Sequence, residues 1–147
     1  MAPEPGRYRF HHVGIVVANL EKALAGYAEA FELQETTVPF EDKAQRVRVA
    51  FVRASGDTRL EFIEPVGVDT PVTQFLAKTR GGGYHHVAFE VPDIEAALRE
   101  FEAARAVVVC PPVVGFEGRR VAFLFPNLQP SLLTEFVEPR PGSRSET

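Results

Sequence analysis

The sequence predicts an α+β fold made of two βαβββ modules in a single domain. Two observations predict it: an internal repeat that spans most of the 147 residues, and the same order of apolar patterns within each copy. A chain of this length with 45% hydrophobic residues can bury about two-thirds of the surface that its unfolded form exposes. We therefore expect residues 1–147 to form one domain, with modules at about 9–66 and 83–139, a linker at 67–82 and a flexible tail at 140–147.

The repeat is found by shifting the sequence by 74 residues. At this offset FHHVGIVV (10–17) aligns with YHHVAFEV (84–91), and EFIEP (61–65) aligns with EFVEP (135–139). The segment RVAF occurs twice at an offset of 72, at 48–51 and 120–123, so the copies differ in length between their strands. Such differences belong to loops. If the two modules pack about a pseudo-twofold axis, equivalent residues converge in pairs.

Each copy contains a strand, a helix and three further strands, in that order. The first strand is followed by Asn19 or Asp93, which are favourable N-cap residues, and then by apolar residues spaced by three and four, as in an amphipathic helix. The three further strands are predicted at about 33–40, 46–54 and 58–65 in the first copy, and at 107–111, 119–125 and 131–138 in the second. In the linker, a short helix is predicted to begin after Asp69.

Composition excludes several functions. Lys and Arg total 16 against 20 Asp and Glu, so the chain lacks the basic surplus that drives nucleic-acid binding. No apolar stretch approaches the roughly 18 residues of a membrane span, and the first nine residues hold no apolar signal core. We therefore expect a cytoplasmic protein with no membrane partner. Because Cys110 is the single cysteine, any metal must be held by histidines and carboxylates.

The four histidines form two His-His pairs at equivalent positions of the repeat, 11–12 and 85–86. His12 is followed 49 residues later by Glu61, and His86 is followed at the same distance by Glu135. Two imidazoles and two carboxylates suit a divalent ion such as Zn, Co, Ni, Mn or Fe. The spacing therefore predicts a metal site; the alternative is that the repeat keeps these residues for folding alone.

Strand geometry selects one histidine of each pair, because neighbouring residues point to opposite faces. His12 and His86 share their faces with the small residues Gly14 and Ala88, which leave room for an ion or a substrate. The other two histidines share a face with apolar residues suited to packing under the helices, so we expect them to be structural or partly exposed. A glutamate in the middle of a strand is costly without a partner, which favours Glu61 and its equivalent over the glutamates that precede prolines at the strand ends.

These motifs resemble the vicinal oxygen chelate superfamily, which has the glyoxalase fold. The resemblance covers about residues 9–139 and rests on HVGI (12–15), LEFIEP (60–65), GYHHVAFEV (83–91) and EFVE (135–138). Within the superfamily, DTPV (69–72) and GRRVAFL (118–124) are most similar to the methylmalonyl-CoA epimerases. The resemblance implies a cupped, eight-stranded mixed sheet, a homodimer, and one metal ion held by His12, Glu61, His86 and Glu135.

The function that this resemblance implies is a metal-dependent epimerase or isomerase. Two vicinal oxygens of a methylmalonyl-CoA-type thioester would bind the ion, which would stabilise the enolate formed when the α-proton is removed. Inversion needs a base and an acid on opposite sides of the carbon, and Glu61 and Glu135 are the candidates. Glu90 and Phe116 are candidate substrate-binding residues.

Two other functions stay open. The loops at 114–118 and 125–131 depart from the epimerase pattern, which fits a divergent lyase or isomerase acting on a specialised acyl or polyketide substrate. A non-catalytic protein that sequesters a ligand could use some of the 12 Phe and 3 Tyr to line its cup, but it would not need four metal ligands. An Fe(II) dioxygenase fits less well, because that chemistry uses two histidines and one carboxylate.

Overall fold

The computed structural model describes residues 7–33, 35–53, 56 and 58–142, which divide into two compact units. The first unit is His12–His85, and the second comprises the described residues before and after it. Strands β1 (Arg9–Val17) and β6 (Gly82–Glu90) each begin in one unit and end in the other. Of the tail expected at 140–147, residues 143–147 lie outside the described part of the chain.

The strands of the first unit follow the order β2 (Glu35–Thr36), β4 (Val47–Arg53), β5 (Arg59–Pro65) and β1, and β3 (Phe40–Asp42) also pairs with β4. Strands β4 and β5 are antiparallel, whereas β1 and β5 are parallel, so this sheet is mixed. The single strand predicted at 33–40 is wrong, because two short strands replace it. Pro39 lies between them, and a proline has no N–H to donate to a ladder. The sequence also predicts a hairpin turn at Gly56-Asp57 between the last two strands of this module, and residues 54–55 and 57 lie outside the described part of the chain.

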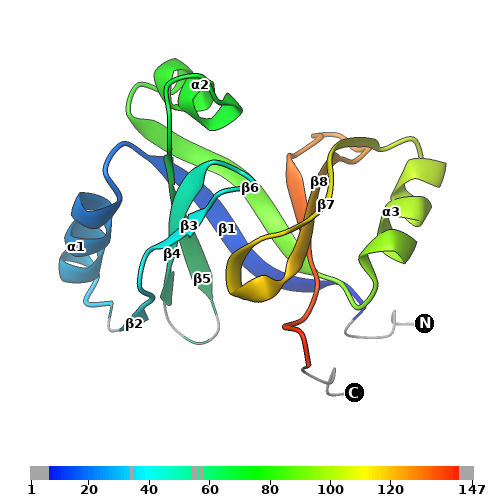
Figure 1. Cartoon of the computed structure of the whole chain (residues 1–147), viewed down its shortest axis with the longest axis horizontal. Coiled ribbons are helices and arrows are strands. Elements are labelled where there is room, and N and C mark those ends of the chain that lie inside the picture. Colours follow the sequence, from blue (N-terminus) through cyan, green and yellow to red (C-terminus); the bar gives the residue numbers. More distant parts are fainter. Residues whose placement is uncertain (1–6, 34, 54–55, 57, 143–147) are drawn as a thin grey trace. The chain divides into compact units, whose positions relative to one another are not determined.

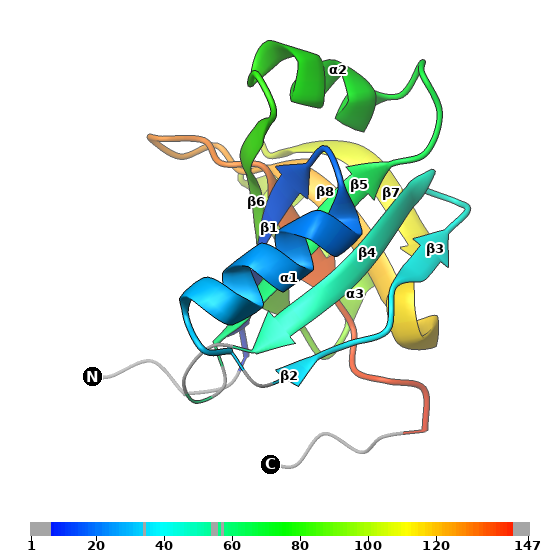
Figure 2. The same cartoon turned by 90° about the vertical axis from the view of Figure 1, so that its left-hand side faces the viewer.

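Two helices cover opposite faces of this sheet. Helix α1 (Leu20–Ala30) begins at Asn19, whose side chain accepts a hydrogen bond from the backbone N–H of Lys22. Helix α1 packs against Ile15 and Val17 of β1, on the face of the sheet shown in Figure 2. Helix α2 (Pro71–Lys78) packs against Val16, which stands between these two residues in the sequence. Successive strand residues point to opposite faces, so the alternation read from the sequence is confirmed. The short helix predicted after Asp69 is confirmed as α2.

The second unit repeats this plan. Its strands follow the order β6, β9 (Thr134–Val137), β8 (Arg120–Phe125) and β7 (Val107–Val114), with α3 (Ile94–Ala103) packed beside them (Figure 1). The described elements also include a short 3-10 helix, η1 (Phe116–Gly118). Strand β9 begins at Thr134 rather than at 131 as predicted, because the Ser131 hydroxyl donates to the Pro126 carbonyl and holds the preceding residues in a loop.

A glutamate at the end of the last strand anchors the helix of each module. The backbone N–H of Leu20, the first residue of α1, donates to Glu64 Oε2 at 2.8 Å, and that of Ile94, the first residue of α3, donates to Glu138 Oε2 at 2.8 Å. A carboxylate is favourable at a helix N-terminus, where backbone N–H groups lack partners. The structure thus gives a defined role to two residues that the sequence marks only as strand-end charges.

An arginine completes each of these contacts. Arg48 Nη1 lies 3.1 Å from Glu64 Oε1, and Arg120 Nη1 lies 3.6 Å from Glu138 Oε2. The same arginines pair with exposed glutamates in the first turns of the helices, so Arg48 lowers the pKa of Glu21, and Arg120 lowers that of Glu95. Helix α1 is therefore joined to β5 and β4 in the same way as α3 is joined to β9 and β8.

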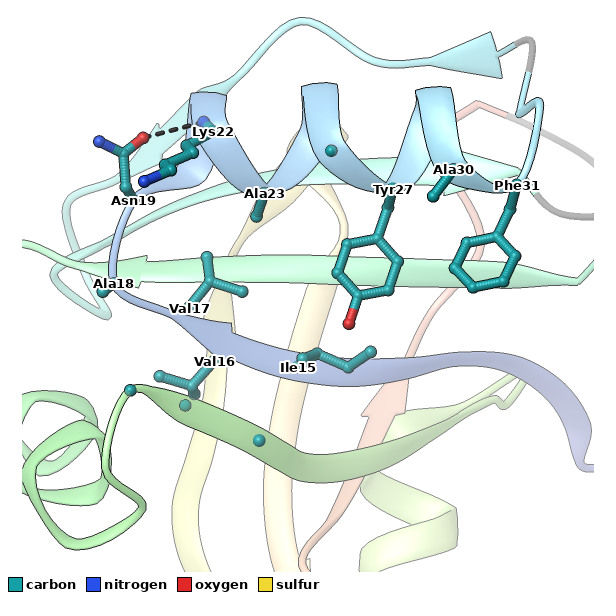
Figure 3. Close-up of a pocket in the computed structure, with 14 residues that line it drawn as sticks. Ile15, Val16, Val17, Ala18, Asn19, Lys22, Ala23, Tyr27, Ala30 and Phe31 are labelled. Atoms are coloured by element: carbon teal, nitrogen blue, oxygen red, sulfur yellow. Dashed lines mark hydrogen bonds between the residues drawn. The ribbon is translucent and has the colours of Figure 1, made fainter.

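A pocket of about 750 Å³ lies between α1 and strands β1 and β6 of the first unit (Figure 3). Tyr27 of α1 and Phe31, the residue that follows the helix, extend toward the sheet (Figure 3), and Gly81, Gly82 and Gly83 also line the pocket. The pocket lies on the α1 side of the sheet, with Ile15 and Val17, so it is on the opposite face of β1 from His12. The predicted ligand His12 therefore lies away from this pocket, on the other face of the sheet.

Candidate functional site

Three adjacent strands of the first unit bring side chains together around Glu61. Its register partners are Gly14 on β1 and Phe51 on β4, and His12 shares the face of Gly14 because it stands two residues earlier. The Nε2 atom of His12 lies 3.4 Å from Glu61 Oε1. The two side chains are 0% and 6% exposed. The first predicted His–Glu pair is therefore formed, and it is buried.

The second unit builds the same arrangement around Glu135. Its register partners are Ala88 on β6 and Phe123 on β8, and His86 stands two residues before Ala88. The Nε2 atom of His86 lies 3.2 Å from Glu135 Oε1, and the side chains are 2% and 3% exposed. Gly14 and Ala88, the small residues expected to leave room for an ion or a substrate, thus lie directly beside Glu61 and Glu135.

The other histidine of each pair packs against an aromatic ring. The ring of His11 lies 5.9 Å from that of Phe116, centroid to centroid. The ring of His85 meets that of Phe75 at 4.9 Å and nearly at right angles. These contacts agree with the structural role expected for both residues.

The donor geometry of each His–Glu pair fits a divalent metal ion. Two ligand atoms that each lie about 2.1 Å from one ion, at roughly tetrahedral angles, are about 3.4 Å apart. The Nε2–Oε1 distances of 3.4 Å and 3.2 Å are within 0.2 Å of this value. A neutral imidazole nitrogen and a carboxylate oxygen are ligands that Zn, Co, Ni, Mn and Fe accept. A direct hydrogen bond from imidazole to carboxylate is the other arrangement that the distances allow, so a metal measurement must separate the two.

Glu90 and Phe116, the predicted substrate contacts, are joined by an arginine. Arg119 is buried, with its guanidinium 5.7 Å above the ring of Phe116 and its Nη1 atom 3.4 Å from Glu90 Oε2. Phe116 itself is 5% exposed. Arg119 also lies 3.6 Å from Glu117, a residue at positive φ (55°) in η1. Sequence reasoning missed Arg119, because an arginine next to a glycine at the start of a predicted strand is ordinarily a surface charge.

Two phenylalanines were also missed. Phe51 and Phe123 each contact the histidine of their module, with ring centroids 5.2 Å and 5.3 Å apart. They stand at equivalent positions of the repeated RVAF segment. A strand phenylalanine ordinarily belongs to a core, but its recurrence next to two predicted ligands was a signal that could have been used.

The chain belongs to the Glyoxalase/Bleomycin resistance protein/Dioxygenase superfamily, whose family model matches residues 11–123. Among its relatives, the mitochondrial methylmalonyl-CoA epimerase of Homo sapiens is 36% identical over 132 residues, which cover 88% of this chain and 73% of the relative. The ethylmalonyl-CoA/methylmalonyl-CoA epimerase of Cereibacter sphaeroides is 36% identical over 121 residues, which cover 81% of this chain and 89% of the relative. These relatives indicate an epimerase.

A solved structure agrees in fold. The methylmalonyl-CoA epimerase of Streptomyces coelicolor, in complex with 2-nitronate-propionyl-CoA, is 28% identical and has a TM-score of 0.82, with 96% of this chain and 100% of that chain covered. The predicted α+β fold of two βαβββ modules, the glyoxalase fold, is therefore confirmed. Within the described part of the chain, none of the helices has the length and apolar character needed to cross a bilayer.

Proposed function

We propose that the protein is a metal-dependent epimerase that inverts the acidic α-carbon of a methylmalonyl-CoA-type thioester. The observation that carries the proposal is the duplicated, buried His–Glu pair, which has the same partners and nearly the same Nε2–Oε1 distance in both units. Its relatives include a methylmalonyl-CoA epimerase and an enzyme named for both ethylmalonyl-CoA and methylmalonyl-CoA, which supports the choice of substrate.

We assign His12, Glu61, His86 and Glu135 as the ligands of one divalent ion. The sequence repeat, the donor chemistry and the family support a single shared ion. When bound there, a divalent ion would supply Lewis acidity to a substrate such as a malonyl thioester and so make its α-proton more acidic.

The two glutamates are the proposed proton carriers. In one direction, the carboxylate of one glutamate takes the α-proton onto an Oε atom, and the carboxylic acid of the other delivers a proton to the opposite side of the carbon. Each glutamate would be a ligand only as a carboxylate and would leave the ion while it carries the proton. The two residues then exchange protonation states through solvent before the next turnover. Burial of both side chains keeps water from competing for the carbon while it carries negative charge.

Glu90 and Phe116 are proposed to border the substrate. Both residues also hold Arg119 in place in this proposal. Glu90 forms an ion pair with the guanidinium of Arg119, and the ring of Phe116 makes a cation–π contact with it. A homodimeric assembly and a cytoplasmic location stay predictions from the sequence.

The proposal is tested by measuring metal and isotope exchange on the purified protein. Metal analysis by mass spectrometry should find one divalent ion per chain. With methylmalonyl-CoA in D₂O, NMR should show deuterium entering the α-position, and a chelator should stop it until Co²⁺ is added back. His86→Ala should lose both metal and exchange. His85→Ala, the adjacent residue on the same strand, is the matched control and should keep both.

Other results point to other functions. Bound metal without deuterium exchange would refute the assignment of methylmalonyl-CoA as the substrate and favour a lyase or isomerase acting on another acidic carbonyl compound. If the protein binds no metal and no deuterium enters the substrate, the proposed epimerase function is refuted. The His–Glu pairs would then be hydrogen-bonded pairs in a ligand-sequestering protein.

A further inference from the structure

Each proposed metal-binding histidine is held against a phenylalanine in the same perpendicular arrangement. The rings of His12 and Phe51 have centroids 5.2 Å apart and an interplanar angle of 79°. The rings of His86 and Phe123 have centroids 5.3 Å apart and an angle of 88°. Edge-to-face contacts of this kind are favoured orientations of aromatic pairs, and here the orientation occurs twice.

The same phenylalanines stand beside the glutamates. Phe51 is the register partner of Glu61, and Phe123 is the register partner of Glu135, across antiparallel strand pairs. Directly opposed residues of such a pair share one face of the sheet. Each phenylalanine therefore contacts the histidine while it lies next to the glutamate that the histidine faces.

This position matters because the torsional preference of histidine does not by itself fix the plane of its ring. Rotation about χ2 of histidine is broad, so the groups packed against the imidazole decide which way its Nε2 points. A phenylalanine packed at right angles to the ring removes most of that freedom. Ligand atoms held in place before an ion arrives bind it more tightly, because less order has to be imposed on binding.

We propose that Phe51 and Phe123 are positioning residues that fix the ring planes of His12 and His86, so that each Nε2 faces its glutamate. The inference rests on the proposed function, since it concerns the same metal site. It assigns to the two rings a role beyond apolar packing, and their equivalence in the repeat accounts for finding them in both modules.

The test compares substitutions that remove the flat ring with one that keeps it. Phe51→Leu and Phe123→Leu retain apolar bulk but cannot hold an imidazole edge-on. Each should weaken Co²⁺ binding by about 10- to 100-fold, the usual effect of losing a group that orients a ligand, and should change the visible spectrum of bound Co²⁺. Phe51→Tyr keeps the ring at a partly exposed position and should restore both.

Phe62→Leu is the matched control. Phe62 follows Glu61 on the same strand but is fully buried in the apolar cluster on the α1 side. Its replacement should lower Tm and leave Co²⁺ affinity and spectrum unchanged. Wild-type affinity and spectrum in Phe51→Leu and Phe123→Leu would overturn the inference, while the metal site itself would stand.

A second measurement needs no metal. In the metal-free protein, the imidazole ¹H–¹³C signals of His12 and His86 should each be a single sharp set, and Phe51→Leu should broaden or split those of His12 but not those of His86. A shift without broadening or splitting is expected from the lost ring current alone and does not count as a response. If the wild-type protein binds no Co²⁺ and these signals still respond as expected, the proposed function fails and the positioning role holds. Imidazole signals that do not respond to the substitution would overturn the positioning role.

Discussion

At the scale of single residues, the site is two copies of one arrangement, in which a glutamate lies between a small residue and a phenylalanine and faces a histidine. The two carboxylates differ in their neighbours by one methyl group, Gly14 beside Glu61 and Ala88 beside Glu135. If each carboxylate serves one side of the substrate carbon, removing one of them should abolish inversion without abolishing all proton exchange.

We therefore predict different outcomes for the two epimers of the substrate. Glu61→Gln and Glu135→Gln should each lower the rate of inversion by about 10²- to 10⁴-fold, the usual contribution of a general acid or base. Each variant should still exchange the α-proton of one epimer with D₂O, and the epimer should differ between the two variants. NMR of each pure epimer measures this directly. Equal loss of exchange from both epimers in both variants would contradict the assignment of one glutamate to each side.

Much of the site could be predicted from residues alone. The repeat offset identified the four proposed ligands, and strand alternation separated His12 from His11, because a slip of one residue reverses the face. Phe51 and Phe123 were not predicted, because their role depends on which side chains meet across neighbouring strands. A sequence pattern gives the face of a residue but not its partner in the next strand.

At the scale of elements, each module fastens its helix through the glutamate that ends its last strand. The sequence predicted both helices and their N-caps, but it could not show that Glu64 and Glu138 reach the first backbone N–H of those helices, since 44 residues separate each pair. The short strands β2 and β3 were also missed, because two-residue and three-residue strands carry too little periodicity to be recognised.

Replacing the anchoring carboxylate should destabilise the fold. Glu138→Gln keeps the shape of the side chain but removes its charge from the N-terminus of α3 and from Arg120. Hydrogen bonds to charged groups contribute about 1.5–3 kcal/mol, so the free energy of unfolding should fall by about 1–2 kcal/mol. Urea denaturation measures it. Glu102→Gln, an exposed position near the end of the same helix, is the control and should change stability little. Equal stability of both variants would show that the anchor contributes nothing.

At the scale of the whole molecule, the proposed ion takes two ligands from each unit. A ligand that binds only the folded state stabilises it, by about 2.7 kcal/mol when its concentration is 100 times Kd. Thermal unfolding with and without Co²⁺ should therefore show a rise in Tm for the wild-type protein. His12→Ala and His86→Ala should each lose this rise completely, although they alter different units. A variant that kept half of the rise would indicate two separate sites.

The register of Gly14 and Ala88 has a further consequence for the kinetics of the proposed enzyme. Ala88, the register partner of Glu135, carries a methyl group that Gly14, the register partner of Glu61, lacks. We therefore expect the proposed enzyme to bind the two epimers, which differ in the side that bears the α-hydrogen, with unequal affinity. A catalyst cannot move the equilibrium between two epimers, and that equilibrium fixes the ratio of the two kcat/KM values. If the difference between Gly14 and Ala88 lowers KM for one epimer, kcat for that epimer must be lower in proportion, so that the ratio of the two kcat/KM values stays equal to the equilibrium constant.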